Sequence, residues 1–151
     1  MVLGHPDEAP LPAEPCPLCP GGPVATKTLL ALPDEPRWQV RVFPHFNPLY
    51  RIEEEVGRKA EGIYDRMRGL GAHEIIVETP DHQRQLAQLS DEEIERVVQA
   101  YALRIADLKR DMRFKYVTIF KNCGVLAGEE WPHAHSQLTA TTFVPRRLLY
   151  E

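Results

Sequence analysis

Four segments of the chain have the patterns that are typical of β-strands. Residues 38–43 and 114–120 alternate between hydrophobic and polar side chains, and residues 73–78 and 135–144 are rich in β-branched or aromatic residues. Glycine or proline interrupts the chain between these segments. We therefore expect four strands that belong to one sheet.

The clearest helix is predicted to begin after Ser90. Ser90 and Glu93 have the spacing of a capping box, in which each side chain accepts a hydrogen bond from the other residue's backbone N–H. Residues 52–68 have a weaker helical pattern, interrupted by Gly57 and Gly62, and predict a shorter helix. The long helix has one hydrophobic stripe, formed by Ile94, Val97, Val98, Tyr101, Ile105 and Leu108.

The order of these elements lacks the regular strand–helix–strand rhythm of a parallel sheet. It predicts an α+β fold, with an antiparallel sheet, one long helix and one shorter helix. Seven of the 14 prolines lie in the first 23 residues, which predicts irregular backbone there. We divide the chain into a proline-rich segment, residues 1–24, and the remainder of a single domain, residues 25–151.

Composition narrows the class of protein. With 43% hydrophobic and 26% charged residues among 151, the chain has the composition of a soluble globular protein. It has neither an apolar run of about 18 residues nor the pattern of a signal peptide, so we expect a cytoplasmic protein that does not bind membranes. The net charge of −4 argues against a nucleic-acid partner, because such proteins are usually basic.

Cys16 and Cys19 form a CxxC pair, whose spacing suits two ligands of one zinc ion and also suits a redox pair. A redox pair usually lies between a strand and a helix start, whereas this pair lies among prolines, which favours a metal. Three cysteines cannot all form disulfides within the chain. Further ligands would have to come from distant histidines: His45, His73, His82, His133 and His135.

His133, His135 and Gln137 alternate along a predicted strand and would share one face of it. Three polar side chains are costly on a buried face, so their pattern suggests a functional site. A solvent-facing strand with two incidental histidines is the alternative.

The stretch from 122 to 131 precedes this motif and contains Gly124 and Gly128. Glycines allow backbone amides to approach an anion closely, and Asn122 could bind a ribose or a phosphate. A plain hairpin turn explains the two glycines equally well.

Together these motifs resemble the N-terminal half of the galactose-1-phosphate uridylyltransferase family, a branch of the histidine-triad superfamily. The likeness runs from about Cys16 to Pro145. It is carried by CPLCPGG at 16–22, WQVRVFP at 38–44, GAHEIIVETPDH at 71–82, LSDEEIERVVQAY at 89–101, RFKYVTIFKNCGVLAG at 113–128 and HAHSQL at 133–138. The resemblance implies a histidine-triad-like fold and covers about half of a family member.

The resemblance implies that His135 is a nucleophile. Its imidazole would attack the α-phosphorus of a nucleoside diphosphate sugar and form a nucleotidyl-histidine. Its other ring nitrogen needs an acceptor, which we expect to be a backbone carbonyl. Gln137 would donate a hydrogen bond to the phosphate. The expected substrate-binding residues are Arg41, Asn122, Gly128 and Gln137.

The resemblance also implies a structural zinc ion held by Cys16, Cys19, His82 and His133. Four protein ligands close a tetrahedral site and leave no position for a substrate. The ion would pin the N-terminal loop beside the catalytic strand.

Two positions depart from the family pattern. Family members commonly have Asn where this chain has His45, and a small residue where it has Glu130. A carboxylate beside a diphosphate would repel it. We therefore expect either that Glu130 points away from the substrate or that the substrate binds differently.

We accordingly predict a nucleotidyltransferase that transfers UMP between hexose 1-phosphates in galactose metabolism. Its small-molecule partners would be a nucleoside diphosphate sugar and a sugar 1-phosphate. Alternatives are a phosphorylase or hydrolase of ADP-sugars or dinucleoside polyphosphates, and a non-catalytic, zinc-stabilised nucleotide-binding half-domain. Because the family pairs two such domains, we expect a homodimer or association with a C-terminal half.

Overall fold

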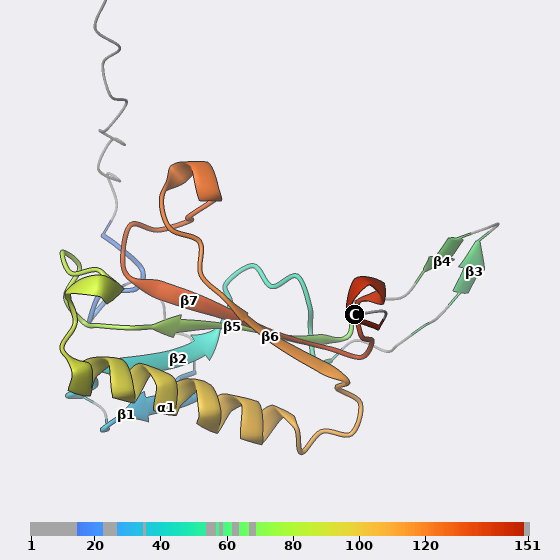
Figure 1. The fold of residues 1–151 in the computed structure, drawn as a ribbon, viewed down its shortest axis with the longest axis horizontal. Coiled ribbons are helices and arrows are strands. Elements are labelled where there is room, and N and C mark those ends of the chain that lie inside the picture. Colours follow the sequence, from blue (N-terminus) through green and yellow to red (C-terminus); the bar gives the residue numbers. More distant parts are fainter. Residues whose placement is uncertain are drawn as a thin grey trace, which may run out of the picture.

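The computed structural model describes residues 15–22, 27–34, 36–53, 57, 59–61, 64–66 and 69–149. Its centre is a five-stranded antiparallel sheet in the order β1-β2-β5-β7-β6 (Figure 1). The strands are β1 Leu30–Leu32, β2 Val40–Pro44, β5 Gly71–Val77, β6 Tyr116–Phe120 and β7 His135–Thr141. The predicted α+β fold with an antiparallel sheet is confirmed, with β1 as an additional edge strand.

The long helix, α1, extends from Asp91 to Leu108 along one side of the sheet (Figure 1). The predicted capping box is present: the Ser90 side chain accepts from the backbone N–H of Glu93, and the Glu93 carboxylate accepts from that of Ser90. The buried residues of the helix are Val97, Ala100, Arg104 and Leu108. The prediction that Ile94 and Val98 belong to the buried stripe is wrong, because they lie on its flank and are exposed.

The two faces of the sheet pack against different partners. Val42, Ile76 and Leu138 face α1 and form one hydrophobic cluster with it. Phe43 and Ile75 face the other way, and pack against a second cluster that includes Leu18 and Trp38. Since Leu18 lies inside the CxxC motif, the N-terminal loop is anchored on the helix-free face.

The predicted shorter helix over residues 52–68 is wrong for the described residues. Lys59–Glu61 (β3) pairs antiparallel with Tyr64–Arg66 (β4) in a separate two-stranded sheet that projects from the main sheet (Figure 1). Gly57 has a φ of +41°, which a right-handed helix does not allow. In the described part of the chain, the remaining helical segments are short 3-10 turns, at Leu86–Gln88, Val125–Ala127 and Arg146–Leu149.

The predicted N-terminal segment, residues 1–24, lies only partly within the described residues. Residues 15–22 form turns, whereas residues 1–14 and 23–26 lie outside the description. The division at residue 24 stays a prediction. Across the described residues, no helix combines the length and the apolar character needed to cross a bilayer.

Candidate metal centre and active site

Four side chains from three distant parts of the chain converge at one end of the sheet. The ligand atoms of Cys16, Cys19, His82 and His133 all lie within 4.8 Å of one another. The Sγ atom of Cys19 lies 3.4 Å from Nδ1 of His82 and 3.5 Å from Nδ1 of His133. The Sγ atom of Cys16 lies 3.7 Å from the same His133 nitrogen.

These separations fit a tetrahedral metal site. With Zn–S of about 2.3 Å and Zn–N of about 2.05 Å, a tetrahedral angle places S and N about 3.6 Å apart. The Nε2 atom of His133 lies 2.7 Å from the carbonyl oxygen of Thr79. That carbonyl fixes the hydrogen on Nε2 and leaves Nδ1 free as a ligand, as outer-sphere hydrogen bonds do in many metal sites. The residues present could therefore hold a zinc ion.

Burial shifts the pKa values of two of these residues in opposite directions. Burial, followed by the neighbouring Cys16, raises the pKa of the Cys19 thiol to about 11 in the metal-free chain. Burial also lowers the pKa of His133, which favours its neutral form. A neutral imidazole is a ligand as it stands, and a bound cation would stabilise the thiolates.

Local structure explains how these ligands meet. A turn links the cysteines, with the backbone N–H of Cys19 donating to the carbonyl of Cys16. A Cβ atom at Gly22 would lie 2.8 Å from the Cys16 carbonyl oxygen, so the turn requires glycine. His82 follows β5 and His133 precedes β7, and these strands are neighbours in the sheet.

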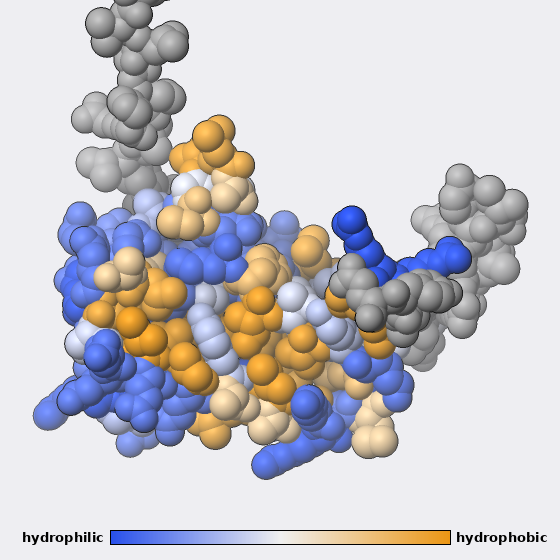
Figure 2. Space-filling view, viewed as in Figure 1, coloured by the Kyte–Doolittle hydropathy of each residue, from blue (hydrophilic) through white to orange (hydrophobic). Residues whose placement is uncertain are grey.

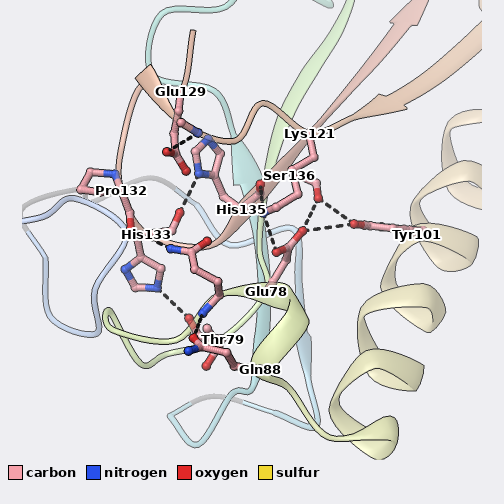
Figure 3. A network of polar contacts seen from close by, with 12 residues as sticks. Glu78, Thr79, Gln88, Tyr101, Lys121, Glu129, Pro132, His133, His135 and Ser136 are labelled. Carbon is pink, nitrogen blue, oxygen red and sulfur yellow. Dashed lines mark hydrogen bonds and ion pairs between the residues drawn. The ribbon is translucent and has the colours of Figure 1, made fainter. Parts of the chain in front are cut away.

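His135, the first residue of β7, is 2% exposed. Its Nδ1 atom lies 2.7 Å from the carbonyl oxygen of His133 (Figure 3). The carbonyl accepts a hydrogen bond, so Nδ1 carries a hydrogen, and in the neutral tautomer the lone pair is then on Nε2. Such an imidazole can act as a nucleophile through Nε2. The contact supplies the backbone acceptor that we expected for this ring.

Gln137 lies two residues further along β7 and therefore on the same face as His135. Its Oε1 atom lies 2.8 Å from Nε2 of His73, on the neighbouring strand β5. Among the described residues, no hydrogen bond involves the Gln137 amide nitrogen. This N–H group is thus available to a ligand on the helix-free face.

Arg41 lies in the same cross-strand row as His135. It pairs with Val77, which in turn pairs with His135, so two strand spacings, about 10 Å, separate Arg41 from His135. Its Nε atom donates to Thr28, and its guanidinium lies 5.6 Å from the ring centroid of Phe43. Arg41 therefore lies on the same face of the sheet as His135, and its role in binding stays a prediction.

The glycine-containing loop forms a turn in which a backbone N–H binds a carboxylate of the same loop. Gly124 and Gly128 have φ of +84° and +78°, conformations that favour glycine. The Asn122 amide lies 3.4 Å from the Gly128 carbonyl oxygen. The backbone N–H of Gly124, expected to approach a ligand, donates instead to the Glu129 carboxylate at 2.8 Å. The loop tip projects as an apolar knob (Figure 2).

Glu130 is directed towards His45. One carboxylate oxygen lies 3.3 Å from Nε2 of this histidine, whose Nδ1 accepts from the backbone N–H of Asn47. This distance would suit an ion pair only if the ring were protonated, and within the described part of the chain Nε2 of His45 has no partner with hydrogen-bond geometry. Burial lowers the pKa of His45, the neighbouring His73 lowers it further, and Glu130 acts in the opposite direction.

A polar network behind His135 was missed in the sequence. Glu78, 1% exposed, accepts hydrogen bonds from Ser136 and Tyr101 and forms an ion pair with Lys121 (Figure 3). Burial raises the pKa of Tyr101 to about 12, so its hydroxyl stays protonated and can donate. The available signal was a carboxylate directly after the hydrophobic run of residues 75–77.

Comparison of the fold with solved structures defines its class. A histidine triad protein from Clostridium difficile superimposes with a TM-score of 0.51 at 19% identity, covering 83% of this chain and 88% of that one. The ADP-glucose phosphorylase of Arabidopsis thaliana, solved with bound ADP-glucose, superimposes with a TM-score of 0.76 at 29% identity, covering 86% of this chain and 41% of that one. The fold is that of the histidine-triad class.

The sequence comparisons then define the family. The family model for the N-terminal domain of galactose-1-phosphate uridyl transferase matches residues 4–145, and the chain belongs to this family. The galactose-1-phosphate uridylyltransferase of Thermotoga maritima is 32% identical over 88% of this chain and 39% of its own length. The Arabidopsis ADP-glucose phosphorylase is 31% identical over 86% of this chain and 38% of its own length. The chain thus spans about two fifths of these relatives.

Proposed function

We propose that this chain carries the nucleotidyl-transfer half-site of a nucleotidyltransferase, with His135 as the nucleophile. The observation that supports it is the hydrogen bond from Nδ1 of His135 to the carbonyl of His133, which in the neutral ring places the lone pair on Nε2. Gln137 lies on the same face, and its amide N–H has no hydrogen-bond partner in the part of the chain that the structure describes. The family membership supports the same assignment.

In the proposed reaction, Nε2 of His135 attacks the α-phosphorus of a nucleoside diphosphate sugar. An N–P bond forms, the P–O bond to the sugar phosphate breaks, and sugar 1-phosphate leaves with the electron pair on oxygen. The ring becomes cationic while Nδ1 keeps its hydrogen, and the His133 carbonyl stabilises that charge. The Gln137 amide would donate to a phosphoryl oxygen. A second sugar 1-phosphate then attacks phosphorus and releases the histidine.

The metal centre has a structural role in this proposal. Zinc held by Cys16, Cys19, His82 and His133 would tie the N-terminal loop to β5 and β7. His133 would then have two roles. His133 would hold the ion through Nδ1 of its ring, while its carbonyl accepts the hydrogen bond that fixes His135. Arg41, Asn122 and Gly128 are proposed to contact the substrate.

The preferred donor is UDP-glucose, with hexose 1-phosphates as leaving group and acceptor. The phosphorylase alternative is favoured by one observation, the Arabidopsis ADP-glucose phosphorylase, which is as similar to this chain as the uridylyltransferase from Thermotoga is. That activity would use the same nucleophile on an ADP-sugar, with inorganic phosphate as acceptor.

The assembly and the location are also proposals. We propose a homodimer or an association with a C-terminal half, because the family model that matches this chain is that of an N-terminal domain. Gel filtration of the purified chain tests the dimer. All three cysteines are free, as is usual in the cytoplasm, where we place the protein.

The test is the intact mass of the zinc-loaded chain after incubation with UDP-glucose and, separately, ADP-glucose, without acid. A gain of one UMP or AMP that is absent in His135→Ala supports the nucleophile and identifies the base. Thr139→Val, on the same strand, is the matched control and should still form the adduct. A folded wild-type chain with no adduct from either donor would favour the non-catalytic nucleotide-binding half-domain.

A further inference from the structure

The hydrogen bonds of His73 determine which of its ring nitrogens carries hydrogen. Its Nδ1 atom accepts from the backbone N–H of Leu49 at 3.1 Å. A backbone N–H can only donate, so Nδ1 is unprotonated and the neutral ring carries its hydrogen on Nε2. This nitrogen lies 2.8 Å from Oε1 of Gln137 and is therefore the donor of that contact.

The same logic fixes the amide of Gln137. An N–H donor at His73 requires an oxygen opposite it, which excludes the flipped amide with its NH₂ group towards the ring. The NH₂ group of Gln137 must then point away from His73. His73 and Gln137 are 5% and 6% exposed, so water has little access to compete for this contact.

The His73 ring is itself held in place. His45 stacks on it with ring centroids 4.1 Å apart and an angle of 14° between the planes. The backbone N–H of His45 donates to the carbonyl of His73 at 2.8 Å, which couples the end of β2 to β5. His45 also accepts a backbone N–H at Nδ1, from Asn47, so both stacked rings are neutral with hydrogen on Nε2.

We propose that His73 is a positioning residue, which orients the Gln137 amide so that its N–H group faces the phosphoryl group attacked by His135. His73 acts through Gln137 and does not touch the substrate. The proposal rests on the proposed function for the identity of the ligand, but the orientation of the amide is independent of it. Loss of a positioned donor to a phosphoryl transition state costs about 10²–10³ in rate, which sets the upper limit of the effect.

The kinetic test is a double-mutant cycle on the rate of nucleotidyl adduct formation at saturating donor. His73→Leu should slow the wild-type chain by about tenfold or more, within the loss caused by Gln137→Leu. In the Gln137→Leu background, His73→Leu should have no further effect. His73→Gln offers an amide N–H in place of Nε2 and should restore most of the rate. Thr139→Val, whose position pairs with His73 across the strands, controls for local packing.

A spectroscopic test separates this inference from the proposed function. In the ¹⁵N-labelled wild-type chain near neutral pH, the His73 ring should have the Nε2–H form, and His73→Leu should shift the side-chain amide resonances of Gln137. An Nδ1–H form or a doubly protonated ring would overturn the inference, as would additive losses in the cycle. Absence of an adduct in wild type would instead contradict the proposed function, and the resonances would still decide the orientation.

Discussion

Lys121 and Glu78 form an ion pair across β7, with Nζ of Lys121 2.8 Å from a carboxylate oxygen of Glu78. Glu78 follows β5 and Lys121 follows β6, and both strands flank β7. The same Nζ atom donates to the backbone carbonyl of His135 at 2.8 Å. The pair therefore fastens the start of β7, where the proposed nucleophile lies, to the strands on each side.

Removal of the cation should destabilise the fold strongly. In Lys121→Met the Glu78 carboxylate remains buried without its counter-charge, and we expect a loss of about 3 kcal/mol in the free energy of unfolding, measured by urea denaturation. Lys121→Arg is the control and should retain most of the stability. The combined Lys121→Met and Glu78→Gln variant should recover part of the loss. A Lys121→Met chain as stable as wild type would contradict this account.

If the proposed metal centre binds zinc, zinc content and stability should change together. Cys16→Ser should abolish stoichiometric zinc and reduce the free energy of unfolding by about 3 kcal/mol or more, because metal-binding energy is folding energy in such sites. Metal analysis and thermal unfolding measure the two effects, and a chelator should reproduce the second in wild type. Cys123→Ser removes an exposed thiol and should change neither. Full zinc content in Cys16→Ser would exclude the assigned ligand.

The contact between Glu130 and His45 predicts a pKa change of known sign. The carboxylate favours the protonated imidazole, whereas burial and the neighbouring His73 oppose it. Glu130→Gln removes the favourable charge, so the pKa of His45, already below its ordinary value of 6.5, should fall further. An NMR titration of the ring protons in both proteins measures the difference. An upward shift would show that the carboxylate does not face the ring in solution.

The stability contributed by the N-terminal end of α1 should decrease at acidic pH. The hydrogen bonds from Arg84 and from the Ser90 backbone lower the pKa of Glu93 from 4.5 to about 2. The lowered pKa of Glu93 stabilises the fold at pH values above the ordinary pKa of 4.5. This contribution is lost as the pH falls from about 4.5 towards about 2.

Unfolding of wild type and Glu93→Gln by urea at several pH values tests this expectation. Glutamine retains a capping oxygen, so the comparison isolates the ion pair with Arg84, whose effect is small because it lies at the surface. The wild type should be the more stable protein at neutral pH, and the difference should shrink on acidification. A difference that is constant with pH would assign the effect to the cap alone.

Local patterns in the sequence determined most of the secondary structure. The alternation in 38–43 and the capping box at Ser90 depend on neighbours within a few residues, and both are present in the structure. The hairpin of β3 and β4 was mistaken for a helix, because its strands are only three residues long and carry no clear period. Arg104 is buried although charged because it forms a salt bridge with Glu74 from β5.

The motif around His135 shows the limit of sequence for the candidate site. Spacing in the chain predicted that His133, His135 and Gln137 share one face, but His133 lies before β7 and its ring turns to the cysteines. The tautomer of His135 depends on the His133 carbonyl, and the orientation of Gln137 depends on His73, 64 residues away. Residue types fix which chemistry is available, whereas hydrogen-bond partners brought together by strand pairing decide which atom performs it.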